Sequence, residues 1–184
     1  MQTQKQYPDF SELAIRAHKN AKEKGFWDNP RPDSEVLILI ISEIGEAVEA
    51  HRKGKFCGID YEYAATPRNI PSGEFSTYIK DTFEDELADT CIRILDYAGY
   101  LGLENLLSGE ALFREEDNLH DVLLRCTGLI FPAWKGTKFR GQYFGTVLYT
   151  LFAYAAHNGI DLLWHIEAKM NFNQTREHRH GKKY

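Results

Sequence analysis

Apolar residues recur at spacings of three and four along most of the 184-residue chain, which is the pattern of amphipathic helices. In the first such stretch, Phe10, Leu13 and Ala17 fall on one helical face. Pro and Gly are few, and they cluster between these stretches. The pattern predicts six helices, over residues 10–24, 33–52, 80–100, 112–131, 141–157 and 161–173.

The segments between the predicted helices are short, with one exception. Residues 54–79 contain Gly, Pro and several Tyr without a helical period, which predicts an irregular excursion with at most a short strand. Residues 132–138 predict a linker, and residues 176–184 predict a basic, polar tail. We therefore expect one all-α domain over residues 1–184, built as an antiparallel helical bundle.

The chain also contains a weak internal similarity. Residues 95–106 resemble residues 152–163 at an offset of 57, which places Gly102 on Gly159. Corners in which a helix ends at glycine share such a pattern in general, and this would account for the similarity without a repeat. If the similarity is a true repeat, residues 1–107 carry the candidate acids, and residues 108–184 form a degenerate second half with the basic tail.

Composition narrows the classes of function. The net charge of −5 argues against binding to a nucleic acid polymer, but a metal ion can still connect acidic residues to a small phosphorylated substrate. Three widely spaced cysteines without metal-ligand spacing indicate reduced thiols and predict a cytoplasmic protein. The N-terminal residues lack the apolar core of a signal peptide, and no apolar run is long enough to span a membrane.

Candidate chemistry lies in two pairs of acidic residues on successive predicted helices. Glu43 and Glu46 are three residues apart on the second helix, and Glu86 and Asp89 have the same spacing on the third. At this spacing two carboxylates leave one face of a helix and repel each other unless a cation lies between them. Because apolar residues flank both pairs, we expect the four carboxylates to converge on one spot, where they would suit Mg²⁺.

A Mg²⁺ site competes with two further roles for these acids. They can be ordinary helix-surface residues paired with Lys and Arg, and Arg93, four residues after Asp89, suits such an ion pair. They can also belong to a di-iron centre, but this would need Glu-x-x-His on facing helices, and the one match, over residues 177–180, lies in the tail. Two acid pairs on successive amphipathic helices favour the Mg²⁺ site over both.

The sequence Glu43-Ile-Gly-Glu46 followed by Glu86-Leu-Ala-Asp89 resembles the signature of the all-α nucleoside triphosphate pyrophosphohydrolases. This superfamily includes MazG-like proteins, dCTP pyrophosphatases and dimeric dUTPases. The resemblance implies hydrolysis of a (deoxy)nucleoside triphosphate to a monophosphate and pyrophosphate, as housekeeping of the nucleotide pool. It also implies that the four acids hold Mg²⁺, with Mn²⁺ as a substitute, and that Glu43 or Glu46 orients the attacking water.

The end of the chain adds to this resemblance. The run from Lys169 through Asn173 to Arg176 is similar to the sequence that closes many family members, which implies that these three residues bind the phosphates. The chain departs from the family in its long segment between the acid pairs and in the two additional helices over residues 108–158. This arrangement is similar to a fused form akin to dimeric dUTPases more than to the simple MazG-like unit.

Base recognition and assembly are the least specified features. Phe26 and Trp27, just before the second predicted helix, are the candidates for stacking on a base, although a hydrophobic staple between helices accounts for them equally well. Apolar residues on more than one face of segments 36–41 and 147–152 predict a homodimer or a higher homo-oligomer. The alternative for the whole chain is a non-catalytic nucleotide-binding sensor or a helical interaction partner that retains the fold.

Overall fold

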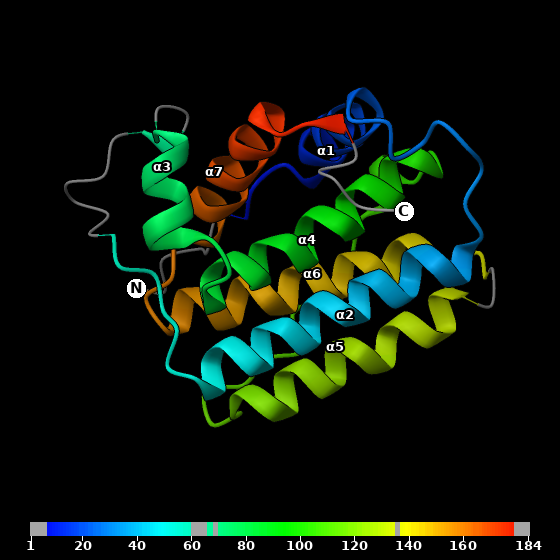
Figure 1. Ribbon diagram of the computed structural model, residues 1–184. Helices are drawn as coiled ribbons and strands as arrows, with labels where there is room; N and C mark the ends of the chain where they lie inside the picture. Colours follow the sequence, from blue (N-terminus) through cyan, green and yellow to red (C-terminus); the bar gives the residue numbers. More distant parts are fainter. Residues whose placement is uncertain (1–6, 60–65, 68–69, 135–136, 179–184) are drawn as a thin grey trace.

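The computed structural model describes residues 7–59, 66–67, 70–134 and 137–178, and these residues form a packed helical bundle without strands (Figure 1). The seven α-helices of this described part are α1 (Phe10–Glu23), α2 (Asp33–Arg52), α3 (Ser72–Glu74), α4 (Phe83–Tyr100), α5 (Leu119–Trp134), α6 (Arg140–His157) and α7 (Leu162–Thr175). A π-helical turn, η2 (Phe75–Ile79), continues α3, and a 3₁₀ turn, η3 (Glu104–Leu106), follows α4. The predicted all-α class is confirmed.

Helix α4 lies at the centre of the bundle and contacts α1, α2, α6 and α7. Its side chains Leu87, Cys91, Ile94 and Leu95 are fully buried in the main core. Figure 1 shows that α2 runs antiparallel to α4, and that α5 runs antiparallel to α6. Because α2 and α4 pack along their apolar faces, residues that flank these faces on one helix lie opposite those on the other.

The start of α4 differs from the sequence prediction. The helix begins at Phe83 instead of near residue 80, because Thr82 caps it by accepting a hydrogen bond from the Asp85 backbone N–H at 3.4 Å. Asp81, just before the cap, has a φ of +58°, which an α-helix does not allow. The helix therefore begins immediately before its cluster of acidic residues.

The boundaries of α5 also differ from the prediction. The helix begins at Leu119 rather than at residue 112, because residues 112–118 form a turn closed by Asp117. The Asp117 carboxylate accepts hydrogen bonds at 2.8 Å from the Arg114 backbone and at 2.7 Å from Arg125. At its other end α5 continues through Pro132 into part of the predicted linker, since proline in the last turn removes few helical hydrogen bonds.

The excursion over residues 54–79 is helical in part, which the sequence did not predict. Its segments α3 and η2 pack against α7, where the ring of Phe75 stacks on that of Phe172 with centroids 4.2 Å apart. Phe75, Ile79, Trp164 and Ala168 form a small second core at this contact. Residues 60–65 and 68–69 lie outside the described residues. The described part of the excursion thus covers one side of α7.

The surface properties bear on two of the expectations. None of the helices in the described ranges has the length and apolar character that crossing a bilayer requires. All three cysteines are free thiols. Residues 147–152 are largely buried inside the single chain, and large exposed apolar side chains lie instead at Ile38, Leu124 and Phe131. The homo-oligomer stays a prediction.

Candidate functional site

Three carboxylates from two helices converge beside the main core. Glu43 of α2 and Glu86 and Asp89 of α4 bring carboxylate oxygens within 4.8 Å of one another. Glu43 and Glu86 are each 4% exposed, and Asp89 is half-buried. We call these three residues the carboxylate cluster. The cluster can hold a metal ion, since closely spaced oxygen ligands of this kind bind hard divalent cations.

Glu46, the fourth predicted ligand, lies at the solvent side of the cluster. It leaves α2 almost one turn after Glu43, but its side chain is exposed. Its carboxylate accepts a hydrogen bond from Ser42 Oγ at 3.1 Å. The role of Glu46 as a metal ligand or as the residue that orients water stays a prediction.

Two cations of the chain lie among the carboxylates. Lys169 of α7 is 5% exposed, and its Nζ lies 2.6 Å from Asp85 Oδ2 and 2.7 Å from Asp89 Oδ2. Arg93 of α4 donates from Nε to Glu43 Oε1. All three ion pairs join two helices, whereas an ordinary surface role for the acids would pair Arg93 with Asp89 along α4. Glu43, Asp85 and Asp89 are therefore part of a network between helices rather than of a solvated helix face.

Burial sets the electrostatics of this network. It raises the pKa of Glu86 to about 8, and the charge of Asp89 adds to the effect. Burial also raises the pKa of Glu43, although Arg93 opposes this shift. For Lys169, burial disfavours the charged form, but Asp89 and Asp85 hold its pKa above the usual value. The cluster therefore favours additional positive charge, which a divalent cation supplies.

Two other acids at the start of α4, Glu84 and Asp85, accept hydrogen bonds from the backbone of the preceding segment. Glu84 accepts a hydrogen bond from the Cys57 backbone N–H at 2.8 Å, which ties α4 to the excursion. Asp85 is fully buried, and its Oδ2 accepts a hydrogen bond from the Asp81 backbone N–H at 2.9 Å. The other oxygen, Oδ1, is buried without a hydrogen-bond partner among the described residues. Asp81, Asp85 and Glu86 form a second group of carboxylates within 4.8 Å of one another.

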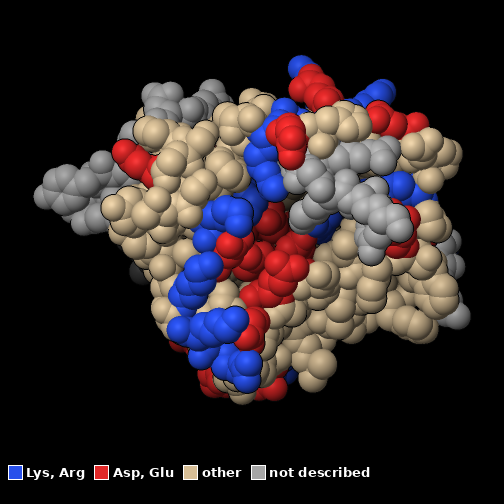
Figure 2. Space-filling model, viewed as in Figure 1, with Lys and Arg blue, Asp and Glu red and all other residues tan. Residues whose placement is uncertain are grey.

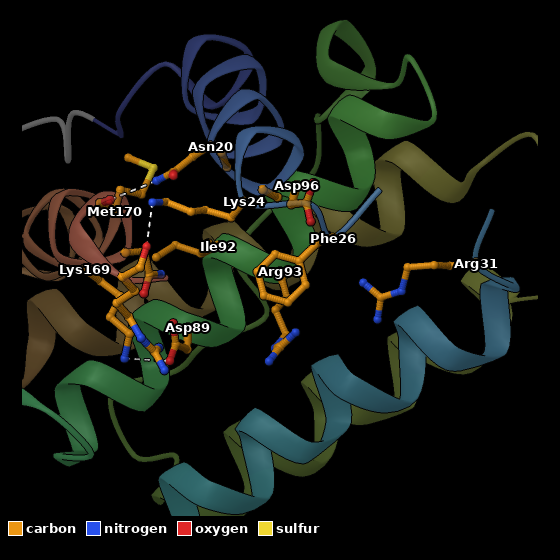
Figure 3. Close-up of a pocket in the computed structure, with 14 residues that line it drawn as sticks. Asn20, Lys24, Phe26, Arg31, Asp89, Ile92, Arg93, Asp96, Lys169 and Met170 are labelled. Atoms are coloured by element: carbon orange, nitrogen blue, oxygen red, sulfur yellow. Dashed lines mark hydrogen bonds and ion pairs between the residues drawn. The ribbon is translucent and has the colours of Figure 1, made fainter. Parts of the chain in front are cut away.

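A pocket opens beside the carboxylate cluster (Figure 3). Asp89 lines it together with Lys169, Asn173 and Arg176, so the three predicted phosphate-binding residues share one cavity with an acid of the cluster. Figure 2 shows acidic side chains gathered in a hollow on this face, with Lys and Arg side chains along its border. A cavity with both signs of charge suits an anion that arrives with a metal ion.

The end of α7 is tied to the end of α1 above the pocket. Lys24 donates from Nζ to two carbonyl oxygens at the end of α7, including that of Arg176, at 2.7 Å each. Gly25 follows with a φ of +79°, and a Cβ at this position would overlap the ring of His178. These contacts fix Arg176 at the pocket. Residues 179–184 of the predicted basic tail lie outside the described residues.

The two predicted stacking residues have different surroundings. Phe26 lines the pocket. Trp27 stacks on Tyr100 with ring centroids 3.9 Å apart, and its Nε1 donates to Asp96 Oδ1 at 2.8 Å. Phe26 is thus placed to contact a ligand, whereas Trp27 holds Asp96, which itself lines the pocket.

Several pocket residues were not found from the sequence. Asp96 lies seven positions after Asp89, two turns along the same helical face, so the helical repeat is a signal that could have found it. Lys24 and Arg31 lie at the end of α1 and just before α2, and no periodic pattern connects them to the acids. Packing of α1 and α7 against α4 brings them to the site.

Comparisons of the chain with protein-family models, with curated proteins and with solved structures found no match. The class of the protein therefore rests on its fold and its candidate site alone. It is an all-α bundle with a buried carboxylate cluster that can hold a metal ion, beside a pocket lined by acids, cations and one aromatic ring.

Proposed function

We propose that this protein is a Mg²⁺-dependent nucleoside triphosphate pyrophosphohydrolase, which hydrolyses a (deoxy)nucleoside triphosphate to a monophosphate and pyrophosphate. The observation that carries the proposal is the meeting of the carboxylate cluster and the cation-lined pocket at Asp89. An acidic site alone would repel a triphosphate, and a basic site alone would not hold Mg²⁺. The substrate of the proposed reaction requires both.

The residues present fit Mg²⁺. The carboxylate cluster offers three oxygen donors, and Asp85 adds a buried oxygen without a partner among the described residues. Bound Mg²⁺ would neutralise the triphosphate and polarise its phosphoryl oxygens. Mn²⁺ accepts the same oxygen ligands and is expected to substitute.

The cations of the pocket would act on the phosphate chain. Lys169 and Arg176 line the pocket and would donate charge-assisted hydrogen bonds to phosphate oxygens, which stabilises the departing pyrophosphate. Asn173 would donate from its amide nitrogen. Lys169, which neutralises Asp85 and Asp89, would exchange these carboxylates for phosphate oxygens. Glu46, exposed beside Glu43, would orient the attacking water.

Pyrophosphate release from a panel of nucleoside triphosphates with Mg²⁺ tests the proposal. We expect release from at least one triphosphate, and a fall of about 10³-fold in the Glu86→Gln variant. Glu46→Gln should reduce turnover as well. The matched control is Glu49→Gln, because Glu49 lies on α2 but pairs with Arg52 and Lys53. Undiminished Mg²⁺-dependent release from Glu86→Gln would contradict the assignment.

A non-catalytic nucleotide-binding sensor or helical partner is the second candidate, and one observation favours it. The chain's own cations already pair with the acids, Arg93 with Glu43 and Lys169 with Asp89. In a scaffold these pairs would serve to link three helices and would require no metal. Nucleotide binding without pyrophosphate release would support this candidate.

A further inference from the structure

The pocket has an end that phosphate binding does not use. Figure 3 shows Lys169 and Asp89 on one side, Arg31 on the other, and Phe26 between them. Asp96 of α4 lines the same cavity. This end therefore combines an anionic acceptor, a cationic donor and an aromatic ring, which together can recognise a flat heterocycle.

Asp96 is held in a fixed orientation. Its Oδ1 accepts a hydrogen bond from Trp27 Nε1 at 2.8 Å and lies 2.9 Å from His18 Nδ1. Trp27 is in turn fixed by its stacking on Tyr100. These contacts use both lone pairs of Oδ1, whereas Oδ2 has no hydrogen-bond partner among the described residues. One carboxylate oxygen of a rigid, 15% exposed side chain thus remains for a ligand.

Arg31 supplies the complementary donor. Its Nε donates to Glu35 Oε1 at 2.6 Å, and its guanidinium carbon lies 5.6 Å from the centre of the Trp27 ring. The Arg31 side chain is 9% exposed, and its Nη2 is buried without a hydrogen-bond partner in the described part of the chain. An unpaired buried guanidinium nitrogen is unfavourable by itself, which points to an acceptor on a ligand.

We infer that Asp96 and Arg31 determine which nucleobase the pocket accepts, and that they select bases with an exocyclic amino group. The inference rests on the proposed function for the presence of a nucleotide. Asp96 Oδ2 accepts a hydrogen bond from the amino group, Arg31 Nη2 donates to the neighbouring ring nitrogen or carbonyl oxygen, and the ring lies against Phe26. Trp27 and His18 are positioning residues for Asp96.

The chemistry of the bases accounts for the expected preference. Cytosine, adenine and guanine each carry an amino group that projects from the ring beside an acceptor atom. Uracil and thymine instead present an N3–H that is recessed between two carbonyl oxygens, and these oxygens repel a carboxylate. The acceptor at Asp96 therefore favours one group of bases and disfavours the other. We expect a preference of about ten- to hundredfold.

CTP and UTP provide the sharpest test, because they differ in the amino or carbonyl group at C4 and the adjacent ring nitrogen. The measurements are kcat/KM for pyrophosphate release and, by calorimetry, the affinity for CMP and UMP. Wild-type protein should prefer the cytidine nucleotides. Asp96→Asn retains an oxygen for Trp27 but adds a donor, so the preference should disappear or reverse. Arg31→Lys retains the charge but loses Nη2, and should weaken CMP binding more than UMP binding.

Two controls separate base recognition from other effects. Inorganic tripolyphosphate lacks a base, so it should inhibit wild type and Asp96→Asn equally. Asp121→Asn makes the same change at an exposed position of α5 and should leave the CTP to UTP ratio unaltered. Circular dichroism checks that each variant is folded.

The outcomes distinguish this inference from the proposed function. A wild-type preference for UTP, or a ratio unaffected by both variants, overturns the inference while the hydrolysis stands. A changed ratio of ribonucleotide to deoxyribonucleotide with an unchanged base ratio overturns it too, because the two residues would then recognise the sugar. If no nucleotide binds or is hydrolysed, both the inference and the proposed function fail.

Discussion

Helices α4 and α6 are alike in shape and opposite in chemistry. Each has 18 residues, and every position of α4 has its counterpart 57 residues later in α6. Each is followed by a glycine with positive φ, +66° at Gly102 and +72° at Gly159. In both corners the next residue donates its backbone N–H to the carbonyl five positions back, at 2.9 Å. The similarity in sequence therefore coincides with a similarity in local structure.

The difference lies on one face of the two helices. At their fourth, seventh and eleventh positions α4 has Glu86, Asp89 and Arg93, whereas α6 has Tyr143, Thr146 and Thr150. The face of α6 is covered by the segment after η3: Gly145 lets the backbone of Ser108 approach closely, and the Leu112 backbone N–H donates to Thr150 Oγ1 at 2.9 Å. On α4 the same face meets α2, α7 and the pocket.

This comparison bears on the role of the acids of α4, Glu86 and Asp89. Helix α6 shows that an 18-residue helix of this bundle forms with neutral residues at these positions, so helix formation itself does not require the charges of α4. Burying carboxylates is unfavourable unless cations compensate them. Their presence on the face that lines a pocket, and their absence from the covered face of α6, therefore favours a ligand site over a structural role.

The largest expected effect comes from exchanging residues between the two faces. Asp89→Thr gives α4 the residue of α6, and we expect Mg²⁺ affinity and pyrophosphate release to fall, the latter by about 10³-fold. The fold should persist, because Lys169 still pairs with Asp85. The reciprocal variant, Thr146→Asp, should gain no Mg²⁺ binding and lose about 1–3 kcal/mol of stability, because it half-buries an acid without a cation. Calorimetry measures Mg²⁺ binding and stability of the two variants, and a pyrophosphate assay measures their turnover. Full activity of Asp89→Thr would contradict the assignment of a ligand site to this face of α4.

Removal of the interior cation should affect stability most. In Lys169→Met nothing replaces the ion pair of the fully buried Asp85, so the free energy of unfolding in EDTA should fall by about 3–5 kcal/mol. Added Mg²⁺ should then stabilise this variant more than wild type, because the acids lack their own cation. Lys53→Met is the control, since it removes an exposed pair with Glu49. An unchanged unfolding temperature of Lys169→Met would show that the interior ion pairs are dispensable.

The covered face of α6 should be sensitive to an added methyl group. In Gly145→Ala the Cβ would overlap the Ser108 carbonyl, so we expect a loss of about 1–3 kcal/mol in denaturant unfolding. The counterpart on α4 is Ala88, which is fully buried without such a clash in its helix. Gly128→Ala on α5 is the control, because a Cβ there meets nothing within 4 Å and should stabilise the helix by about 1 kcal/mol. Equal effects of the two variants would mean that the segment around Ser108 does not pack tightly against α6.

The sequence was sufficient for the long helices and for part of the site. Apolar periodicity predicted α2, α4 and α6 within a few residues, because each has a strong buried face. The start of α5 was mispredicted, since Leu112 and Phe113 continue the apolar pattern while Asp117 closes a turn. The spacing of the acids was enough to predict that Glu43 and Glu86 lie close together, because their two helices pack along apolar faces.

The rest of the site depends on long-range packing. Lys169 lies 84 positions after its partner Asp85. No local sequence pattern predicts that a lysine of α7 pairs with an acid at the start of α4. The same holds for Arg31, which enters the pocket from the loop before α2. Helical periodicity describes which face of a helix is buried, and it does not describe which residues of a third helix meet that face.

The last expected effect concerns the change of stability with pH, and it measures the cost of burying one acid. The pKa of Glu86 rises from about 4.5 to about 8 in the fold, so the folded state favours the protonated form. The stabilisation from that proton is complete below pH 4.5 and is lost as pH rises through 8. Glutamine does not ionise, so Glu86→Gln does not lose this stabilisation. In EDTA the variant should therefore become more stable than wild type as pH rises from 4.5 to 8, by on the order of 2 kcal/mol after screening. Thermal unfolding from pH 4.5 to 8.5 measures the difference, with exposed Glu49→Gln as control. A difference that stays flat with pH would mean that Glu86 is already ionised in the fold, and saturating Mg²⁺ should produce that same flat profile in wild type.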